Sequence, residues 1–553
     1  MASKRVLIVG GVAGGASCAA RLRRLDEQAE IFIFERGPDI SFANCGLPYY
    51  IGGAIADRQH LLVATPERFR DVFNIEVRTR SEVRRIDRAK KTIEVQNVET
   101  AAAATEPYDV LVLSPGAVPL RPRLPGIDLP HIFTLRNLED VDRIYDRLVR
   151  HNSERAVVVG GGYIGLEMVE NLSRRGIHVT VLEQLDQVMP IMDPEMVAPV
   201  HEELRRQGVD LRLGNGVTAF EPAARETITV IARSGEHFTA GLVILAIGVR
   251  PDVRLAQGAG LEIGPLGGIR VDDQMRTSDP AIFAVGDAVE VRDYVTGRPA
   301  LVALAGPANR QGRVAADVIC GRDARFRGAQ GTAVVGVFDV TVAKTGPSEK
   351  VLRREGIPFE KSYTHWAHHA GYYPGAQRIS LKLLFAPGTG RLLGAQAVGR
   401  SGVDKRIDVL ALAIQNHATV FDLEEAELCY APQYGSAKDA VNIAGFVAGN
   451  ILRGDVEPAH WTQWRAGRAA GAQMPLVVDV RSPLEVAAGA VPGTINIPLG
   501  ELRTRLDELP RDREIWVHCG VGQRSYYASR ILKQHGFRVR NLSGGMTSFR
   551  MEG

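Results

Sequence analysis

Two of the chain's five cysteines stand in stretches that suit sulfur chemistry. Cys45 lies in "SFANCGLPYYIGG" (41–53), among glycine, proline and aromatic residues, and Cys519 ends the strand-like run "EIWVHC". A thiolate attacks a disulfide sulfur to give a mixed disulfide, provided that polar neighbours, a helix N-terminus or a cofactor's charge depress the thiol pKa. We therefore treat Cys45 and Cys519 as candidate catalytic residues. A buried, inert cysteine is the alternative for each, and it is our expectation for Cys18, Cys320 and Cys429.

The loop "CGVGQRS" that starts at Cys519 has the form of an anion cradle. Backbone N–H groups of residues 520–524 can encircle a sulfur anion, as anion-binding nests do. Arg524 adds positive charge, and a helix is expected to begin near Ser525. The loop would stabilise a thiolate or a Cys–S–S⁻ persulfide. A phosphatase cradle has a similar spacing of cysteine and arginine, and the loop alone leaves that alternative open.

Two glycine clusters predict the elements that would deliver electrons. "KRVLIVGGVAGGASCAARLRRL" (4–25) and "RAVVVGGGYIGLEMVENLSRRGIHVTVLEQ" (155–184) each read as strand, glycine turn and helix, the order of a βαβ dinucleotide site. Glycines let the backbone approach a pyrophosphate at the helix N-terminus. The second cluster has the full fingerprint, whereas Val12 replaces the middle glycine of the first. Each following strand ends in an acidic residue, Glu35 or Glu183, that can bind ribose hydroxyls. No Arg or Lys directly follows Glu183, which favours NADH over NADPH.

Three further strand-then-glycine segments fit the same plan. "RTSDPAIFAVGDAVE" (276–290) places Asp287 at the carboxyl end of a strand, where ligands bind in open α/β sheets. A turn aspartate that caps the next helix is the alternative. Segments 109–117 and 242–252 fit crossings between two nucleotide-binding domains.

The composition is that of a globular protein, and it argues against several partners. Of the residues, 45% are hydrophobic, and 67 basic against 64 acidic residues give a net charge of +3. This balance offers no electrostatic case for nucleic acid or an anionic membrane. No apolar run approaches the roughly eighteen residues of a membrane span, and "MASKRVLIVGG" reads as a strand and not as a signal peptide. Dispersed cysteines favour a reducing compartment. We expect a cytoplasmic protein, with no membrane or nucleic-acid partner and no metal.

The order GGVAGG, SPGA, GGGYIG, AIGVRP and AVGDA resembles the pyridine nucleotide–disulfide oxidoreductase family over about residues 1–450. The resemblance implies FAD and NADH as cofactors. It assigns to FAD the positions Gly10, Gly11, Val12, Ala13, Gly14, Gly15, Glu35, Arg36, Asn44, Val83, Gly116, Gly286 and Asp287. It assigns to the nicotinamide nucleotide the positions Gly160, Gly162, Tyr163, Ile164, Gly165, Glu183 and Gly248.

Within that family, "SFANCGLPYYI" resembles the branch with one active cysteine, and in particular the coenzyme A–disulfide reductase group. The resemblance implies that Cys45 is the redox thiol and that coenzyme A can bind. It places substrate contacts at Ser17, Arg21, Arg24, Ser41, Phe42, Asn44, Asn309, Arg310 and Lys438. Arg21 and Arg24 share a helix face and can point at one anionic group, although a solvated basic face is the alternative. "VFNIEV" lacks the lysine that some members carry near Phe73, which leaves the coenzyme A phosphates without that cation.

The later segments resemble two further domains of known type. Residues 326–450 resemble the family's dimerisation domain, which implies a homodimer whose Tyr372 and Tyr430 serve the partner's active site. A tyrosine hydroxyl can donate to a leaving thiolate, and interface packing is the alternative. Residues 474–553, with Asp479 and Arg481 in "DVR" and the Cys519 loop, resemble a rhodanese domain, which favours sulfur transfer over the phosphatase alternative.

The predicted fold class is α/β, with two Rossmann-like dinucleotide-binding domains, an α+β dimerisation domain and a C-terminal α/β rhodanese domain. The predicted boundaries are 1–150 and 276–325 for a discontinuous FAD-binding domain, 151–275 for the NAD(H)-binding domain, 326–450 for dimerisation, 451–473 for a linker and 474–553 for the rhodanese domain.

The predicted function is an FAD-dependent NADH:persulfide or polysulfide reductase that acts on a small, coenzyme A-linked substrate and releases a thiol and hydrogen sulfide. Cys519 would carry sulfur, and Cys45 would cleave the S–S bond. One alternative is a coenzyme A–disulfide reductase with an auxiliary rhodanese domain. Another is a redox-sensing carrier that delivers persulfide to a partner protein.

Overall fold

The structure is a computed structural model that describes residues 3–151 and 153–553. Its contacts divide the chain into two compact units. The first unit holds the residues up to 188 together with 208–331, and the second holds 189–207 together with 332–553. Among the described residues, no helix combines the length and the apolar character needed to cross a membrane.

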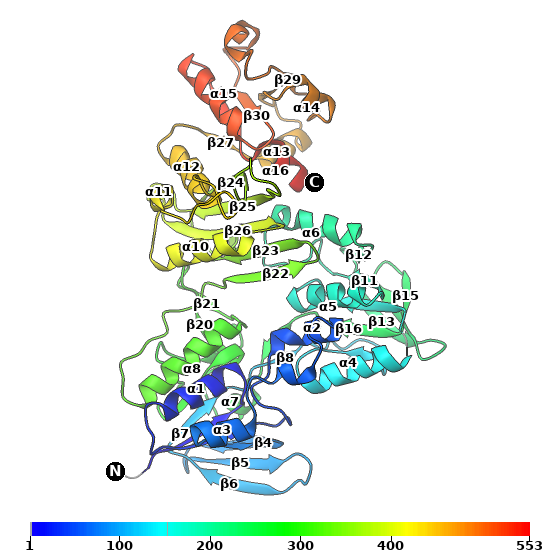
Figure 1. The fold of residues 1–553 in the computed structure, drawn as a ribbon, viewed down its shortest axis with the longest axis vertical. Helices are drawn as coiled ribbons and strands as arrows, with labels where there is room; N and C mark the ends of the chain where they lie inside the picture. Colours follow the sequence, from blue (N-terminus) through cyan, green and yellow to red (C-terminus); the bar gives the residue numbers. More distant parts are fainter. Residues whose placement is uncertain (1–2, 152) are drawn as a thin grey trace. The chain divides into compact units, whose positions relative to one another are not determined.

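The first unit contains two five-stranded parallel sheets of the dinucleotide-binding type. The first sheet has the order β19-β7-β1-β2-β3, with strands Ile282–Ala284, Val110–Leu113, Arg5–Val9, Glu30–Phe34 and Glu76–Arg78. The strands are nearly continuous apolar runs, as expected for parallel strands covered on both faces. Helix α1 (Ala13–Arg23) packs along α8 (Ala305–Ile319), as Figure 1 shows. Gly312 permits this approach, because a Cβ there would overlap the Gly14 carbonyl oxygen.

The second sheet of this unit has the order β12-β11-β10-β16-β9. Its strands are Asp210–Arg212, His178–Leu182, Arg155–Val159, Leu242–Leu245 and Ile132–Phe133. Helix α5 (Tyr163–Arg174) follows β10, so each sheet has its own strand–glycine–helix turn. Because β9 pairs with β16, the first dinucleotide-binding domain ends before residue 132, earlier than the expected 150. Each sheet has a three-stranded antiparallel companion, β4-β5-β6 (Ser81–Asp87, Thr92–Asn97, Ala103–Pro107) or β13-β14-β15 (Val217–Pro222, Ile228–Ala232, His237–Ala240).

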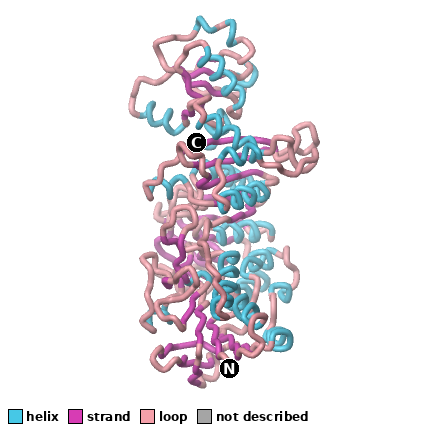
Figure 2. Tube along the Cα trace, turned by 90° about the vertical axis from the view of Figure 1, so that its left-hand side faces the viewer, coloured by secondary structure: helices cyan, strands magenta, loops and turns pink. Residues whose placement is uncertain are grey.

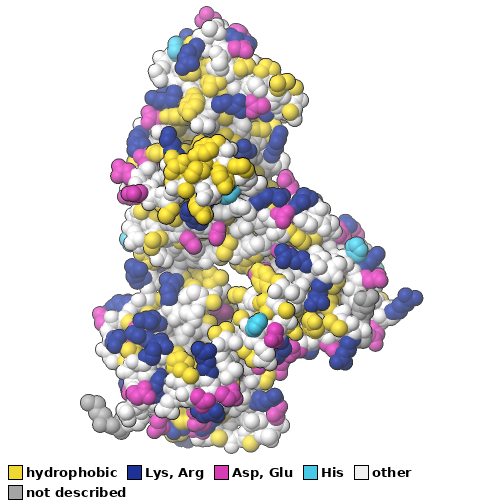
Figure 3. Space-filling model, viewed as in Figure 1, with side chains coloured by type: hydrophobic (Ala, Val, Ile, Leu, Met, Phe, Trp, Pro, Cys, Tyr) yellow, Lys and Arg dark blue, Asp and Glu magenta, His cyan; other side chains and the backbone are white. Residues whose placement is uncertain are grey.

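The second unit begins with a five-stranded antiparallel sheet of order β22-β23-β26-β25-β24. The strands are Ala333–Val337, Val340–Thr345, Leu392–Gly399, Arg378–Phe385 and Glu360–Ala367. Five helices accompany it: α6 (Pro194–Arg206), α9 (Glu349–Arg354), α10 (Val403–Gln415), α11 (Val420–Glu425) and α12 (Ala440–Leu452). Helix α6 was expected in the NAD(H)-binding domain, yet its contacts assign it to this unit. Figure 3 shows hydrophobic side chains gathered over the part of the unit that carries α12.

The C-terminal domain is a parallel sheet of order β27-β31-β30-β28-β29 with helices around it, as Figure 2 shows. Its strands are Pro458–Ala459, Val539–Leu542, Ile515–His518, Leu476–Asp479 and Ile495–Asn496, and its helices are α13 (Trp461–Ala469), α14 (Pro483–Ala487), α15 (Gln523–Gln534) and α16 (Gly545–Met551). Residues 451–473 were expected to be a linker, but β27 is an edge strand of this sheet. Trp461 and Trp464 of α13 pack in its core, so the domain begins well before residue 474. The Ala/Gly/Arg-rich composition suggested a connector, but two buried tryptophans make this segment a helix of the domain.

Candidate functional site

The first glycine turn is a backbone cradle with room for a ligand but none for side chains at two positions. Gly10 has φ +94, and a Cβ there would overlap the Ser114 carbonyl oxygen, while a Cβ at Gly15 would overlap the Gly10 oxygen. Val12 is tolerated at the middle position because its φ is −96, which any L-residue adopts. The departure from the glycine fingerprint is therefore compatible with the predicted turn.

The second turn repeats this geometry. Gly160 has φ +103, and a Cβ at Gly165 would overlap the Gly160 oxygen. A Cβ at Gly162 would meet nothing within 4 Å, so the space beside this residue is open. The N-cap residues of α1 and α5, Val12 and Gly162, supply no capping side-chain hydrogen bond. Unfilled N–H donors at a helix start suit a phosphate, and both cradles therefore fit a dinucleotide.

The acidic residues that end β2 and β11 hold these turns in place. Glu35 accepts hydrogen bonds from the backbone N–H of Gly11 and of Gly37, both at 3.0 Å. Glu183 accepts from Gly161 N–H at 2.7 Å and from Leu185 N–H at 2.8 Å. A carboxylate has further lone pairs, so each can still accept from a ribose hydroxyl.

Asp287 lies where the sequence predicted, directly after β19, in a short 3₁₀ turn (Gly286–Ala288). Burial raises the pKa of its carboxyl group. The turn is anchored by Gln311, whose side-chain oxygen accepts the Gly286 N–H at 2.7 Å.

The two predicted crossing segments meet. Strand β8 (Ala117–Pro119) pairs antiparallel with β17 (Val249–Pro251), next to Gly116 (φ +72) and Gly248 (φ +112). Of the other positions assigned to cofactors, Val83 is buried in the core, Tyr163 and Ile164 begin α5, and Arg36 interacts electrostatically with Asp252.

Cys45 is exposed at the start of a helical segment. It lies in a 3₁₀ turn (Asn44–Gly46) that leads into α2 (Leu47–Gly52). Although the residue reaches solvent, desolvation by the surrounding protein atoms, followed by the carboxylates of Glu167 and Asp287, raises the pKa of the thiol. Of the sources expected to depress this pKa (polar neighbours, a helix N-terminus or a cofactor's charge), the chain's own neighbouring groups do not supply it. The thiol therefore keeps its proton at neutral pH until another positive charge or a base offsets these carboxylates.

Glu167 is a residue near Cys45 that sequence reasoning missed. It lies on α5, one turn after the second glycine cluster, and accepts a hydrogen bond from the Tyr49 hydroxyl at 3.3 Å. Burial raises its pKa to about 7, so this carboxyl can exchange a proton near neutral pH. The i+4 spacing from Tyr163 was visible in the sequence, but the proximity to Cys45 depends on the packing of α2 against α5.

A pocket of about 340 Å³ opens beside α1 and brings together most of the predicted substrate contacts. Five of its lining residues were predicted: Ser17, Arg21, Arg24, Ser41 and Asn309. Phe69 and Arg313 also line it and were missed. Arg313 follows Asn309 by one helical turn of α8, a spacing that could have indicated it.

Of the three arginines that line this pocket, one is already paired with a carboxylate of the chain. Arg21 forms an ion pair with Asp317 at 2.7 Å, so Arg21 and Arg24 do not act as the equivalent pair that their spacing suggested. Arg24 and Arg313 are the pocket's other cationic side chains. Ser17 donates to the Asn309 side-chain oxygen at 2.6 Å, which ties α1 to α8 at the pocket wall.

The remaining predicted substrate residues lie elsewhere. The Arg310 guanidinium stacks over Phe326, with 5.6 Å to the ring centroid. The Asn44 side chain donates to the Arg136 carbonyl at 3.2 Å, and Phe42 bridges to Leu62. Lys438 is in the second unit, where its carbonyl oxygen accepts from Trp366.

Tyr372 and Tyr430 meet in the second unit. Their hydroxyl oxygens are 2.8 Å apart, and the side chains are 76% and 50% exposed. Exposed phenols that share a hydrogen bond are available to a neighbouring molecule, as their predicted role requires.

In the Cys519 loop, one backbone N–H of the predicted segment 520–524, that of Gly522, reaches the sulfur, together with a side-chain hydroxyl. Cys519 is fully buried, and its Sγ accepts from the Gly522 N–H at 3.2 Å and from the Ser525 hydroxyl at 3.5 Å. The first turn of α16 holds the other side of the loop, since Met546 N–H donates to the Cys519 carbonyl at 2.7 Å.

The Asp479–Arg481 pair of the "DVR" segment anchors α14, the helix that carries the ion-pair partner of Arg524. Asp479 and Arg481 form a buried ion pair at 2.7 Å. The same guanidinium donates to the carbonyl oxygens of Glu485 and Gly489 and so fixes α14. From α14, Glu485 forms a two-point ion pair with Arg524, at 2.6 and 2.7 Å. Sequence reasoning missed Glu485, although Ser482 and Glu485 form a capping box whose S-x-x-E signature was visible.

Comparisons with known proteins agree with this geometry. The family described as "Pyridine nucleotide-disulphide oxidoreductase" matches residues 4–310, its dimerisation domain matches 332–440, and "Rhodanese-like domain" matches 463–552. Coenzyme A disulfide reductase from Staphylococcus aureus (strain bovine RF122 / ET3-1) is 37% identical over 445 residues, which cover 80% of this chain and 99% of the relative.

Two solved structures are similar over both units. Reduced Bacillus anthracis CoADR-RHD matches with a TM-score of 0.97 and 49% identity, covering 100% of this chain and 98% of that chain. The NAD-dependent persulfide reductase from A. fulgidus matches with a TM-score of 0.90 and 38% identity, covering 99% of this chain and 100% of that chain.

These matches confirm the predicted fold class, with dinucleotide-binding, dimerisation and rhodanese-like domains, and the two cradles fit the FAD and NADH that the family implies. The chain belongs to the pyridine nucleotide-disulphide oxidoreductase family and is a flavin-dependent oxidoreductase that acts on sulfur–sulfur bonds.

Proposed function

We propose that the protein is an NADH-dependent reductase of small organic persulfides, with a coenzyme A-linked persulfide as the substrate class. The observation that carries the proposal is the Cys519 cradle, in which a buried sulfur accepts hydrogen bonds from Gly522 and Ser525. A reductase of simple disulfides has no evident use for a sulfur-binding cradle. The structural likeness to an NAD-dependent persulfide reductase over 99% of the chain supports the same conclusion.

The pocket beside α1 supports a coenzyme A-linked substrate. Arg24 and Arg313 can contact phosphate groups, while Phe69 offers an apolar wall to a thiol-bearing arm. These cations stand in place of the lysine that the sequence lacks near Phe73.

The chemistry assigned to Cys45 is nucleophilic. Its thiolate attacks the outer sulfur of R–S–SH, so that a Cys45 persulfide forms and the thiolate RS⁻ leaves. Two-electron reduction of the Cys45 persulfide would release HS⁻, and FAD held in the first glycine cradle would supply these electrons from NADH. The sum is R–S–SH plus a hydride equivalent giving RSH and HS⁻. Glu167, which has a pKa of about 7 and interacts electrostatically with Cys45, is the proposed acceptor of the Cys45 proton.

We also propose a homodimer in the cytoplasm. The matched dimerisation domain and the exposed Tyr372–Tyr430 pair support an active site completed by the partner's phenols. The five free cysteines suit a reducing compartment. Sedimentation at nanomolar concentration tests the dimer, and a fully active monomer would contradict it.

Cys45→Ser tests the redox assignment. The variant should retain FAD and accept hydride from NADH, because hydride transfer does not need the thiol. It should lose at least about a hundredfold of S–S reduction, since a hydroxyl is a far weaker nucleophile at neutral pH. Stopped-flow bleaching of the flavin and steady-state NADH oxidation separate the two steps. Wild-type turnover in this variant would refute the assignment.

Coenzyme A–disulfide reduction is the second candidate, because curated relatives of that name share 37% identity. The comparison uses coenzyme A disulfide and coenzyme A persulfide as alternative acceptors. A kcat/KM at least tenfold higher for the persulfide supports the proposal, and the reverse ratio supports the second candidate. A redox-sensing carrier would show little turnover with either acceptor.

A further inference from the structure

The charge beside the sulfur cradle is not what the sequence of the loop suggests. Arg524 follows Cys519 within the loop and would give it a positive charge. In the structure, both terminal nitrogens of Arg524 instead bind the two carboxylate oxygens of Glu485, at 2.7 and 2.6 Å. The pair at the cradle is therefore close to neutral.

Glu485 is held in this position from two directions. The Ser482 N–H and hydroxyl both donate to Glu485 Oε2 at 3.1 Å, which completes the capping box of α14. Arg481 donates to the Glu485 carbonyl oxygen at 3.1 Å and anchors the backbone of the same helix. The Arg524 hydrogen bond lowers the pKa of Glu485 to about 2, so its charge persists across the working pH range.

This ion pair lies beside the loop, since a Cβ built on Gly520, the residue after Cys519, would be 3.5 Å from Arg524 and 3.9 Å from Glu485. Cys519 is fully buried, whereas the side chains of Arg524 and Glu485 are 39% and 40% exposed. Arg524 also contacts the Cys519 thiol, and both Cys519 and Glu485 contribute to its raised pKa. A sulfur donor that reacts at Cys519 therefore comes near a carboxylate as well as a guanidinium.

We propose that Glu485 determines which sulfur donors load Cys519, favouring monoanionic organic persulfides over the thiosulfate dianion. This inference rests on the proposed role of Cys519 as a sulfur carrier. Repulsion from one fixed charge scales with the charge of the donor, so a dianion is disfavoured twice as strongly as a monoanion in free-energy terms. Without Glu485, Arg524 would attract the dianion more than the monoanion by the same rule.

The transfer steps balance for both donors. From a persulfide, the Cys519 thiolate takes the outer sulfur of R–S–S⁻, forming Cys519–S–S⁻ and releasing RS⁻. From thiosulfate, the same attack forms Cys519–S–S⁻ and releases sulfite, SO₃²⁻. Each step makes one S–S bond and breaks another, and neither requires an external oxidant or reductant.

The test uses Glu485→Gln in the full-length protein, in a Cys45→Ser background so that the loaded sulfur is not reduced. Mass spectrometry follows the single-turnover rate of sulfur addition at Cys519, with thiosulfate or cysteine persulfide as donor. A charge about 6–7 Å from the donor in water-like surroundings changes the rate about threefold per unit of donor charge. We expect roughly a threefold gain with cysteine persulfide and roughly a tenfold gain with thiosulfate, with both gains reduced in 0.5 M salt.

Three further variants make the result decisive. Glu485→Asp keeps the charge and should retain the wild-type preference. Glu508→Gln removes an equal charge from the Arg505 ion pair of the same domain and should change neither rate. Cys519→Ser should abolish loading by both donors, and loading that persists would overturn the carrier role itself. Equal changes for the two donors, or no change, in Glu485→Gln would show that Glu485 only orients Arg524 and would overturn the specificity proposal alone.

Discussion

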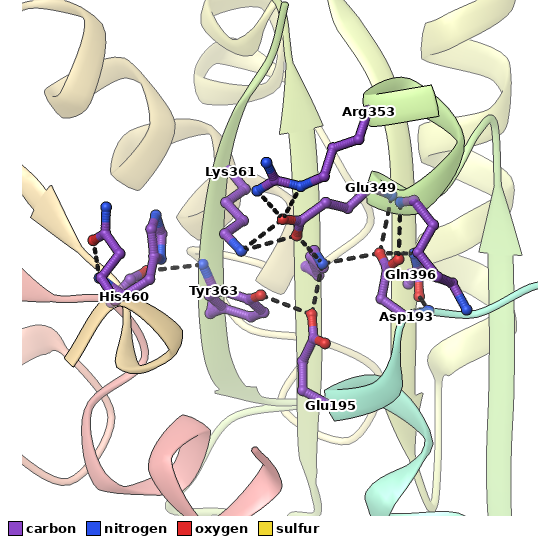
Figure 4. A network of polar contacts seen from close by, with 12 residues as sticks. Asp193, Glu195, Glu349, Arg353, Lys361, Tyr363, Gln396 and His460 are labelled. Carbon is purple, nitrogen blue, oxygen red and sulfur yellow. Dashed lines mark hydrogen bonds and ion pairs between the residues drawn. The ribbon is translucent and has the colours of Figure 1, made fainter. Parts of the chain in front are cut away.

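Replacing Lys382 by Met should destabilise the second unit, because it removes a buried positive charge from among three carboxylates. Lys382 lies on β25 and is completely buried. Its ammonium group pairs with three carboxylates, Asp193 at 2.9 Å, Glu195 at 2.5 Å and Glu349 at 2.7 Å. Figure 4 shows these carboxylates converging, Glu195 from α6, Asp193 from the residue before α6 and Glu349 from α9 (Glu349–Arg354). The three acids, which together could suggest a metal site, instead surround an ammonium group.

The size of the effect follows from the partners that each acid retains. Asp193 still accepts from the Gln396 side chain and from the Glu349 N–H, and Glu349 still pairs with Lys361 at 2.9 Å. Glu195 keeps the hydrogen bond from the Tyr363 hydroxyl at 2.7 Å. Removing one partner of a buried ion pair costs about 3–5 kcal/mol. Because two acids remain well bonded, we expect the free energy of local opening to fall by about 3 kcal/mol. This loss corresponds to a change of roughly a hundredfold in the opening equilibrium.

Hydrogen–deuterium exchange of peptides 189–207 and 378–399 measures this opening directly. A global melting curve would mix several domains and is less informative. Lys90→Met, which removes a lysine that is 79% exposed, serves as the control and should leave exchange unchanged. Adding Glu195→Gln to Lys382→Met should recover much of the protection, since the least compensated charge is then gone.

The loss of stability in Lys382→Met should depend on pH, and this dependence tests the explanation. Lys382 and Lys361 lower the pKa of Glu349, so their stabilisation is present above the ordinary carboxyl pKa and is lost as the pH falls through the depressed value. In the variant the acids protonate more readily, so its deficit should be largest near pH 7 and should shrink towards pH 4.5. Exchange within threefold of wild type at pH 7, or a deficit that does not change with pH, would refute the reasoning.

Two more predictions concern the C-terminal domain. Burial, with Glu195 nearby, raises the pKa of Glu552 to about 7, so the folded state holds this proton more tightly and loses stability as the pH rises from about 4.5 to 7. Glu552→Gln should match wild type near pH 5 and melt a few degrees higher at pH 8, by differential scanning calorimetry; a constant difference at all pH values would contradict this. Gly545 has φ +57, and a Cβ there would overlap the Cys519 carbonyl oxygen, so Gly545→Ala should slow sulfur loading of Cys519 by about tenfold or more while Cys45-dependent NADH oxidation continues. Gly536→Ala is the matched control, because its φ is +81 but its Cβ would come no nearer than 3.8 Å to another group, and equal loss in both variants would point to backbone strain alone.

Local patterns were sufficient for the elements whose chemistry is local. Strand, glycine turn and helix follow one another within about 25 residues in each dinucleotide cradle, and the turn needs a glycine only where φ is positive or another backbone is close, as at Gly10 and Gly160. The surroundings of Cys519 were in part predictable, because both donors to its sulfur, Gly522 and Ser525, lie within six residues of it in the sequence. Composition misled us for α13, since an Ala/Gly/Arg-rich segment resembles a linker until Trp461 and Trp464 are seen to be buried.

Contacts between distant segments could not be predicted, because they depend on which strands pair. Strands β28 and β30 are parallel neighbours, so their carboxyl ends lie at the same edge of the sheet. That register brings α14, which follows β28, against the Cys519 loop, which follows β30, and so joins Glu485 to Arg524 across 39 positions of sequence. The sequence by itself indicated two dinucleotide cradles and, through the family resemblance, Cys45 and Cys519 as candidate reactive thiols. Only the tertiary structure decided the charge that each cysteine experiences, because Glu167, Asp287 and Glu485 act through space and not along the chain.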